Sequence, residues 1–411
     1  MKLNQIRLSR EIVSELEAFA QILGADPEIP KPTKRFLAES LYGMLKARSV
    51  VLSQIARQLQ GPQPVLYRLQ RLSSQLRSSR WDPLSCASSY LQWAAGELEP
   101  DTVLSADIGD IWKKYAKHMP GLSPVWDGSD KTVKKTGYFL AEIEAVRGDG
   151  RHVPLYLEPL SSRKASYVSQ NHQMDLAIDF VISHIGTKGI WAMDRGFDDV
   201  KRFKFLDERK LSWVIRAKGT RHAQKAGLPY LKSQAISELA ARMNPSITLS
   251  LESAGTRLAL RAASLRVELK DQPDLGYSLV VVWTRRKNPW YLLTNLPASS
   301  ACQIQRVVRA YAARWGVEDA ARVIKQCFDL ENIRLLTFQG IRKMVWLALW
   351  AYAFLCRIGL WPKRYLNILL STVKALWPWR SLKIIHYRLS EFIARALIWP
   401  PPKNQGFVQR G

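Results

Sequence analysis

The chain has 411 residues and a mass of 46.9 kDa, which is enough for two or three domains of ordinary size. Hydrophobic residues make up 47% of it and charged residues 23%, and this balance excludes a fibrous repeat and a largely disordered chain. The 61 Lys and Arg outnumber the 35 Asp and Glu, so the net charge is +26 and the pI is near 10.0. Such a charge indicates a polyanionic partner, either nucleic acid or an anionic membrane surface, without indicating a reaction.

The start of the chain runs straight into charged residues and has no apolar segment, so secretion is not indicated. The longest apolar run, residues 344–356, is shorter than the ~20 residues of a membrane span and predicts a buried helix. We therefore expect a cytoplasmic protein. The cysteines are far apart and form no CxxC pair, which predicts reduced core residues rather than zinc ligands: Cys86, Cys302, Cys327 and Cys356.

The first hundred residues are predicted to be helical. From residue 10 to about residue 92 the apolar positions recur at helical spacing. Residues 49–59, a Gly-Pro turn and residues 65–76 predict a helix-turn-helix, and four arginines lie on or beside it: Arg57, Arg68, Arg71 and Arg77. The pattern favours a small DNA-reading module, although an ordinary helical hairpin with arginines on its solvent face would show the same pattern.

After residue 101 the pattern changes to an alternation of strands and helices, which predicts an α/β core. Strands are expected at residues 102–108, 138–146, 153–160, 189–194 and 212–217, and helices at residues 171–185 and 198–210. Gly148, Asp149 and Gly150 are expected to form a hairpin turn.

Residues 220–297 return to strand-like alternation and predict a β-rich insertion in the α/β core. From residue 300 onward the chain is again predicted to be helical. Between residues 332 and 411 there are thirteen Lys or Arg and a single acid, Glu391, so this end of the chain should face phosphate or solvent.

Three acidic residues stand out by their predicted places. Asp107 lies near the end of the first strand, Asp194 ends a later strand, and Glu318 lies on the helix after the insertion. A carboxylate that ends a buried strand costs free energy unless it binds a cation or a donor, although a turn or helix-capping role would also explain Asp194. At about 100° per residue, one narrow face of a helix would carry the following side chains: Tyr311, Arg314, Glu318 and Lys325.

Three carboxylates on a very basic protein suggest metal-assisted catalysis on a phosphodiester, with two Mg²⁺ ions, or Mn²⁺ as a substitute. Hard cations prefer oxygen ligands, and the absence of His/Cys clusters from the sequence argues against zinc. Arg314 and Lys325 would then neutralise phosphate charge.

The spacing Tyr311-(2)-Arg314-(3)-Glu318-(6)-Lys325 resembles the Y-(2)-R-(3)-E-(6)-K signature of DDE transposases of the insertion sequence 4 family. Residues 107–113 resemble the first-aspartate block of that family, and residues 194–198 resemble its D-R-G-F-D block. The resemblance extends over about residues 104–353. It departs from the family at Gly109, where the family often has Thr, and at Asp110, which adds a fourth carboxylate.

The resemblance implies an α/β, RNase H-like catalytic core, in which the first and fourth strands are neighbours and a flanking helix supplies the third acid. It implies catalytic and metal-binding roles for Asp107, Asp194 and Glu318. It also implies DNA-binding roles for a second group of residues: Tyr311, Arg314, Lys325, Arg195 and Trp290. Trp290 resembles the insertion-domain tryptophan that stacks on a flipped base in hairpin-forming members, although a core tryptophan would fit the same position.

We therefore expect a transposase that binds the terminal inverted repeats of an insertion sequence, cleaves them and transfers the strands to target DNA. It would act on double-stranded DNA as a homodimer, in the nucleoid of a bacterial cytoplasm. A nuclease or domesticated relative, and a non-catalytic basic DNA-packaging protein, are the alternatives. The expected segments are a helical DNA-binding domain (1–98), the first part of the core (99–219), the β-rich insertion (220–297), the second part of the core with Glu318 (298–358) and a basic helical tail (359–411).

Overall fold

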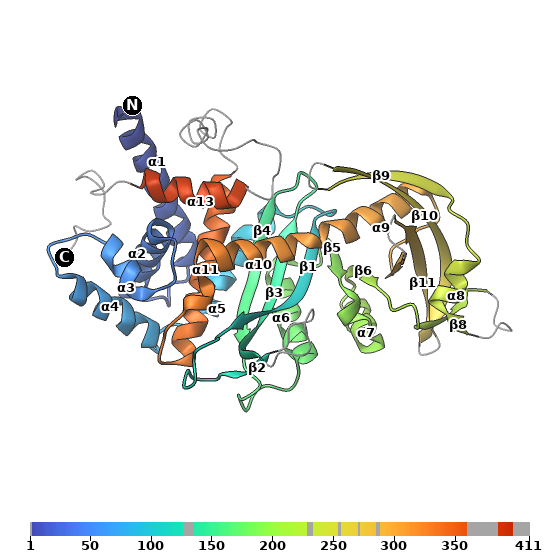
Figure 1. The fold of residues 1–411 in the computed structure, drawn as a ribbon, viewed down its shortest axis with the longest axis horizontal. Helices are drawn as coiled ribbons and strands as arrows, with labels where there is room; N and C mark the ends of the chain where they lie inside the picture. Colours follow the sequence, from blue (N-terminus) through green and yellow to red (C-terminus); the bar gives the residue numbers. More distant parts are fainter. Residues whose placement is uncertain are drawn as a thin grey trace.

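The computed structural model describes residues 2–125, 135–227, 233–253, 256–269, 272–284, 288–359 and 385–397. It is a mixed α/β structure in which a helical part, a central sheet and a β-rich part follow one another along the long axis (Figure 1). The described helices are α1 (Lys2–Leu23), α2 (Lys31–Ala47), α3 (Leu52–Gln58), α4 (Val65–Arg77), α5 (Pro83–Ala94), α6 (Gln170–Ile185), α7 (Val200–Glu208), α8 (Ile236–Ala241), α9 (Ala301–Ala313), α10 (Trp315–Cys327), α11 (Phe338–Ile358) and α13 (Ile385–Ala396).

The described strands form one twelve-stranded sheet. Their bounds are β1 (Val103–Trp112), β2 (Ser123–Val125), β3 (Lys135–Val146), β4 (His152–Leu160), β5 (Ile190–Met193), β6 (Ser212–Arg216), β7 (His222–Lys225), β8 (Gln234–Ala235), β9 (Ile247–Ser253), β10 (Thr256–Leu269), β11 (Gln272–Trp283) and β12 (Trp290–Thr294). The predicted strands and helices of the α/β core are all confirmed, with ends that differ by a few residues.

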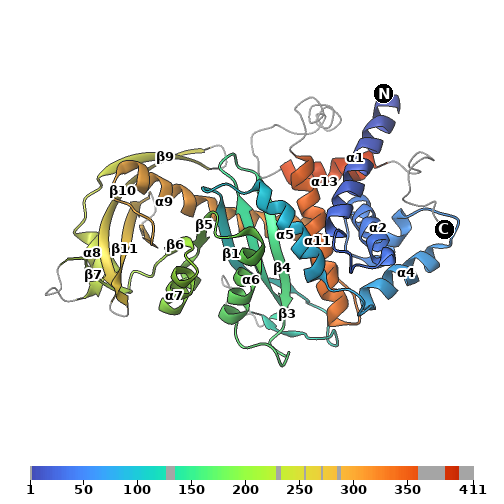
Figure 2. The ribbon, with the colours of Figure 1, turned by 180° about the vertical axis from the view of Figure 1, so that it is seen from behind.

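The part of the sheet that matters for the candidate site has the order β4-β3-β1-β5-β6. Strand β3 is antiparallel to β1 and β4, whereas β1, β5 and β6 are parallel. Strands β1 and β5, which are the first and fourth when the three-residue β2 is left out, are therefore neighbours, as predicted. Helices α9 and α10 cross one face of the sheet, and α6 and α7 lie on the other (Figures 1 and 2).

The strands of the predicted insertion continue the same sheet. Strand β12 pairs with the core strand β6, and β11 and β10 follow it outward. Alternation in the sequence indicates that strands exist but not which strands pair, so this continuity could not be predicted from the pattern alone.

The helical part begins with α1 to α5, as predicted. Helix α3 begins at Leu52, later than the predicted residue 49, because Val51 is extended and the Val50 N–H donates to the carbonyl of Phe328. Helix α5 begins with Pro83 in its first turn, and the Asp82 side chain accepts a hydrogen bond from the Leu84 N–H.

The apolar run predicted to be a buried helix is confirmed as part of α11, whose side chains are buried along most of its length. None of the described helices combines the length and the hydropathy that a membrane crossing requires. The prediction for the cysteines is wrong at one position: Cys86, Cys327 and Cys356 are buried, but Cys302, in the first turn of α9, is exposed.

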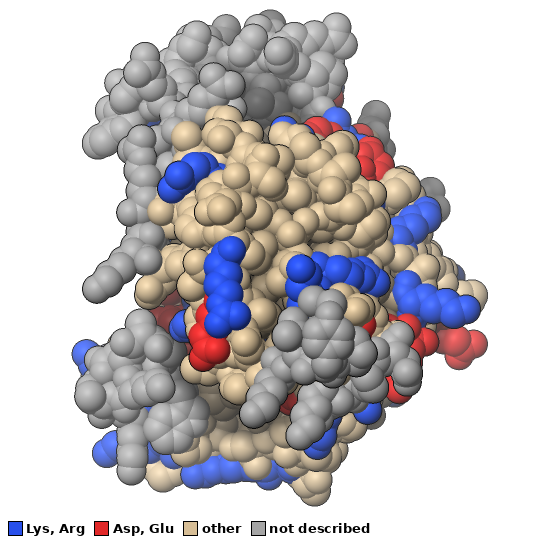
Figure 3. All heavy atoms as spheres, turned by 90° about the vertical axis from the view of Figure 1, so that its right-hand side faces the viewer, with Lys and Arg blue, Asp and Glu red and all other residues tan. Residues whose placement is uncertain are grey.

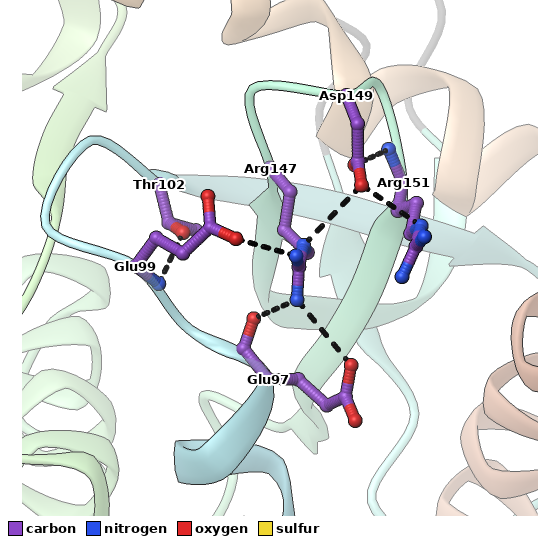
Figure 4. Close-up of polar contacts among 6 residues, drawn as sticks. All are labelled: Glu97, Glu99, Thr102, Arg147, Asp149 and Arg151. Carbon is purple, nitrogen blue, oxygen red and sulfur yellow. Dashed lines mark hydrogen bonds and ion pairs between the residues drawn. The ribbon is translucent and has the colours of Figure 1, made fainter.

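The segment that leads from the helices into β1 is held by one arginine (Figure 4). The Arg147 side chain donates to the backbone carbonyl of Glu97 and pairs with the carboxylates of Glu97, Glu99 and Asp149. Arg147 follows β3 at the predicted hairpin turn, where Gly150 has a φ of 82° that favours glycine. These contacts fix the start of β1 to the β3–β4 hairpin.

Candidate active site

The pairing of β1 with β5 brings two of the predicted acids together. The printed register aligns Leu104 with Trp191 and Ser105 with Ala192. Two residues further along these parallel strands, Asp107 and Asp194 are expected to be neighbours, on strands about 4.8 Å apart. Sheet topology therefore places two residues that are far apart in the sequence on adjacent strands.

Asp194 lies at the end of β5, where the chain turns into a short 3-10 helix, Arg195–Phe197. Its Oδ1 accepts a hydrogen bond of 2.7 Å from the Gly196 N–H, so Asp194 also has the capping role that the sequence left open. Arg195 is exposed beside it.

The helix predicted to carry the third acid is divided in two at Arg314, which lies between α9 and α10. Glu318 is in the first turn of α10, where a negative charge is favoured by the helix dipole. Its Oε1 accepts a hydrogen bond of 2.7 Å from Arg314, whose side chain is only 7% exposed. Arg314 Nε is buried and has no hydrogen-bond acceptor among the described residues.

The pKa of the Asp107 carboxyl is affected by both other predicted acids and by Arg314. The pKa of the Asp107 carboxyl is raised to about 6, first by burial and then by the negative charge of Asp194. The Glu318 charge also raises this pKa, whereas the Arg314 charge and the Ile108 N–H, which donates to Asp107 Oδ1 at 2.8 Å, lower it. All three predicted acids are thus close enough to interact.

Lys325, in the last turn of α10, pairs with the additional carboxylate that departs from the family pattern. Its Nζ lies 3.3 Å from Asp110 Oδ1. The Lys325 charge also lowers the pKa of Glu142, a residue of β3. Lys325 therefore connects α10 to β1 in this structure, and its charge acts on the buried acid of β3.

Glu142 is a residue of this site that the sequence reasoning missed. Its backbone lies opposite that of Asp107 in the β1–β3 register. Its Oε1 is buried with no hydrogen-bond partner among the described residues. Burial raises the pKa of the Glu142 carboxyl to about 8, opposed by Lys325 and assisted by Asp107 and Asp110. Two acids two residues apart, Glu142 and Glu144, in the otherwise apolar residues 138–146 were the signal in the sequence.

Gly109, which departs from the family pattern, lies against the buried carboxyl of Glu142. A Cβ atom on Gly109 would lie 2.3 Å from Glu142 Oε1, so a threonine here would require Glu142 to move. The absence of a side chain at Gly109 and the presence of Glu142 are thus coupled.

Tyr311 and Trp290 pack against each other rather than forming an open face. Their ring centroids are 5.4 Å apart in an edge-on arrangement, and Tyr311 is only 2% exposed. The four residues of the signature therefore do not share one solvent-facing surface. Trp290 is partly buried at the start of β12. The cations that precede it in the sequence, residues 285–287, lie outside the described residues.

The carboxylates have the chemistry that a hard divalent cation requires, since each supplies oxygen ligands. The buried Glu142 Oε1 without a partner is a further oxygen beside them. In the described part of the chain, however, no three His, Cys, Asp or Glu side chains are grouped closely enough to hold a metal ion. The type of ligand is therefore right for Mg²⁺ or Mn²⁺, but the grouping is not, and Glu318 is paired with Arg314.

Comparison with known families agrees with this picture. Residues 163–354 match the family model described as the transposase DDE domain. The matched segment, which begins after β4 and ends within α11, supports a DDE transposase. It includes Asp194 and Glu318 but not Asp107.

No curated protein matches the chain. Among solved structures, the chain is similar to the piggyBac transposase in a synaptic complex with hairpin DNA, at 12% identity and a TM-score of 0.39, over 98% of this chain and 82% of that one. A similarity of this size defines neither fold nor function.

Proposed function

We propose that this protein is a DDE transposase of the insertion sequence 4 type, with an RNase H-like core that cleaves and transfers DNA strands. The observation that supports it most is the placement of Asp107 and Asp194 on the neighbouring parallel strands β1 and β5, with Glu318 on α10 near enough for its charge to raise the pKa of Asp107. The family match over residues 163–354 supports the coarser part of the proposal, a DDE transposase, and the net charge of +26 suits a DNA partner.

In this proposal Asp107, Asp194 and Glu318 are the catalytic, metal-binding acids. Two divalent ions bound there would supply charge stabilisation for the attacking and leaving oxygens of an in-line displacement. The residues themselves orient the scissile phosphate: water attacks in the first step, and the 3′-hydroxyl that it releases attacks in the second. The Asp107 carboxyl, with its pKa of about 6, would be largely ionised at neutral pH.

Arg314 is the residue best suited to contact a phosphate. Its guanidinium has a buried Nε without an acceptor among the described residues, and one of its two terminal nitrogens, Nη2, donates to Glu318. A phosphate could accept from this planar group in a fixed geometry. Lys325 and Arg195 would contribute further positive charge, and Trp290 would stack on an extruded base, with Tyr311 behind it.

The helices of residues 1–98 are proposed to bind the terminal inverted repeats, and the basic residues after 358 to contact phosphates. Two copies would bring two ends together with target DNA, in a bacterial cytoplasm. Most of the residues after 359 lie outside the described part of the chain.

The direct test uses labelled duplexes that carry the ends of the DNA element encoding this chain. In Mg²⁺ or Mn²⁺ we expect nicks that leave 3′-hydroxyls at the element boundary, followed by joining to a second duplex. In EDTA both products should disappear. Cleavage without joined products would replace the proposal with a nuclease, and binding with no cleavage in any metal would replace it with a packaging protein.

A further inference from the structure

The outer helices carry a stretch of sequence without any negative charge. Residues 48–81 contain six arginines and no Asp or Glu. Figure 3 shows the opposite, β-rich end of the molecule, where lysines and arginines are spread over the surface and acidic side chains lie among them. The stretch contains α3 and α4, and α4 lies at the outer edge of the helical part (Figures 1 and 2).

Helix α4 presents an unusual outer face. At about 100° per residue, one stripe along the helix carries Tyr67, Gln70, Ser74 and Arg77, and all four are exposed. Leu66 adjoins this stripe and is 63% exposed, and Tyr67 is 52% exposed. Large apolar side chains that gather on a surface usually mark an interface.

The inner face of α4 is fixed to the rest of the molecule. Leu72 and Leu76 are fully buried on that side. Arg71 pairs with Glu39 of α2 at 2.7 Å, and Lys343 of α11 donates to the carbonyl of Ser78 just beyond the end of α4. The outer stripe is therefore held in place by both α2 and α11, which is the rigidity that a recognition element needs.

We propose that the α4 stripe, defined as Leu66, Tyr67, Gln70, Ser74 and Arg77, enters the major groove of duplex DNA and reads base pairs. The chemistry matches the groove: glutamine pairs with the adenine edge, apolar groups contact the thymine methyl, and arginine binds guanine or phosphate. A helix of thirteen residues is long enough to lie in a groove about 12 Å wide. The absence of acids from residues 48–81 removes repulsion from the flanking phosphates.

The inference rests on the proposed function only in taking duplex DNA as the partner. It goes further by assigning sequence recognition to one helix and by predicting a site that contains A·T pairs. The N-terminal residues of the helix, Leu66, Tyr67 and Gln70, would contact the base edges, because a recognition helix usually reads bases with its first turns.

The test is a binding selection that needs no cleavage. The full-length protein in EDTA is mixed with duplexes that carry a random internal segment, and the bound DNA is sequenced. The wild-type protein should select a motif with A·T pairs. Gln70→Ala should lose the preference at one or two adjacent positions and bind the selected duplex about five- to 150-fold more weakly, as expected for a lost bidentate contact. Binding to unselected duplexes should stay within about twofold.

A second measurement addresses the apolar part of the stripe. Replacing thymine by uracil in the selected duplex removes one methyl group and should weaken wild-type binding about fourfold. The double variant Leu66→Ala, Tyr67→Ala should not distinguish the two duplexes. Leu176→Ala, which removes a leucine that is 50% exposed on α6, is the matched control and should behave as wild type.

Three results would overturn the inference. The wild-type protein could select no motif, the Gln70→Ala variant could select the same motif as the wild type, or Gln70→Ala could weaken binding to selected and unselected duplexes equally. Conversion of a dimer to a monomer by Leu66→Ala, Tyr67→Ala with an unchanged motif would assign the stripe to contact between two copies instead. A protein that selects the motif but never cleaves would remove the proposed function and leave this inference standing.

Discussion

The two sides of the candidate site place their carboxylates in opposite ways. On the β1–β3 side, Asp107 and Glu142 lie within strands, largely buried, and the pKa of each carboxyl is raised. On the β5–α10 side, Asp194 and Glu318 lie at the end of a strand and in the first turn of a helix. There a backbone N–H and an arginine already stabilise them.

The difference shows which of the acidic residues lower the stability of the folded protein. A carboxylate at the end of an element has water, backbone donors and the helix dipole beside it, so it costs little. A carboxylate within a strand loses its hydration and is placed near other acids, so it costs stability until a cation neutralises it. Substitutions on the two sides should therefore separate activity from stability in different ways.

The largest effect is expected on the β5–α10 side. Asp194→Asn keeps the Oδ1 acceptor for the Gly196 N–H but loses the charge that holds a cation. We expect strand cleavage to fall on the order of 10³-fold, since several kcal/mol of transition-state stabilisation depend on such a ligand. DNA affinity and the melting temperature should remain near those of the parent. Cleavage at the parental rate in saturating Mg²⁺ would remove Asp194 from the site.

Trp290, at the start of β12, tests whether a residue outside these two sides acts in one step only. If its ring stacks on an extruded base, Trp290→Ala should slow the second-strand cut about five- to 150-fold and leave the first nick nearly unchanged. Loss of its contact with Tyr311 would instead destabilise the core and slow both cuts together. Single-turnover rates of each cut, with a thermal melt of the variant, distinguish the two roles.

On the β1–β3 side, the substitution Asp107→Asn should remove activity and at the same time increase the free energy of unfolding. The folded-state pKa of Asp107, about 6, is above its ordinary value of 3.8, so the folded protein binds this proton more tightly than the unfolded chain. Stability is therefore lost as the pH rises from about 4 to 6, by roughly 2–3 kcal/mol in all. Asp107→Asn should regain that amount at pH 7.5 in EDTA and nothing at pH 4.

The check is chemical denaturation of both proteins at the two pH values. Asp194→Asn, at the partly buried end of β5, is the matched control and should show no comparable gain. If Asp107→Asn were less stable than the parent at pH 7.5, the burial of this charge would not be the cost that the structure indicates.

The sequence predicted the elements that carry the three acids because strand alternation and helical spacing are local properties. It did not predict the division of the helix at Arg314. That division accompanies a close approach of α10 to β3, where a Cβ on Gly316 would lie 2.4 Å from Val146, and no local pattern indicates such a contact. Nor did it predict that Tyr311 would be buried against Trp290, because spacing places residues on a helix face without showing what covers it.

The coupling of Gly109 to Glu142 gives a small predicted effect, and the one most specific to the β1–β3 side. Gly109→Ala places a methyl group 2.3 Å from Glu142 Oε1, so the buried carboxyl must move, at a cost of about 1–3 kcal/mol in the free energy of unfolding. The same substitution in a Glu142→Ala background should cost little, because the atom it meets is gone, and the double-mutant cycle should return most of the cost as coupling. Gly148→Ala, with open space around it, is the matched control.

On the β5–α10 side a Cβ at Gly196 would lie 3.0 Å from Asp194 Oδ1, so Gly196→Ala should cost less than Gly109→Ala. Equal cost of Gly109→Ala with and without the Glu142 carboxyl would show that the backbone of β1, rather than the buried acid, requires glycine there.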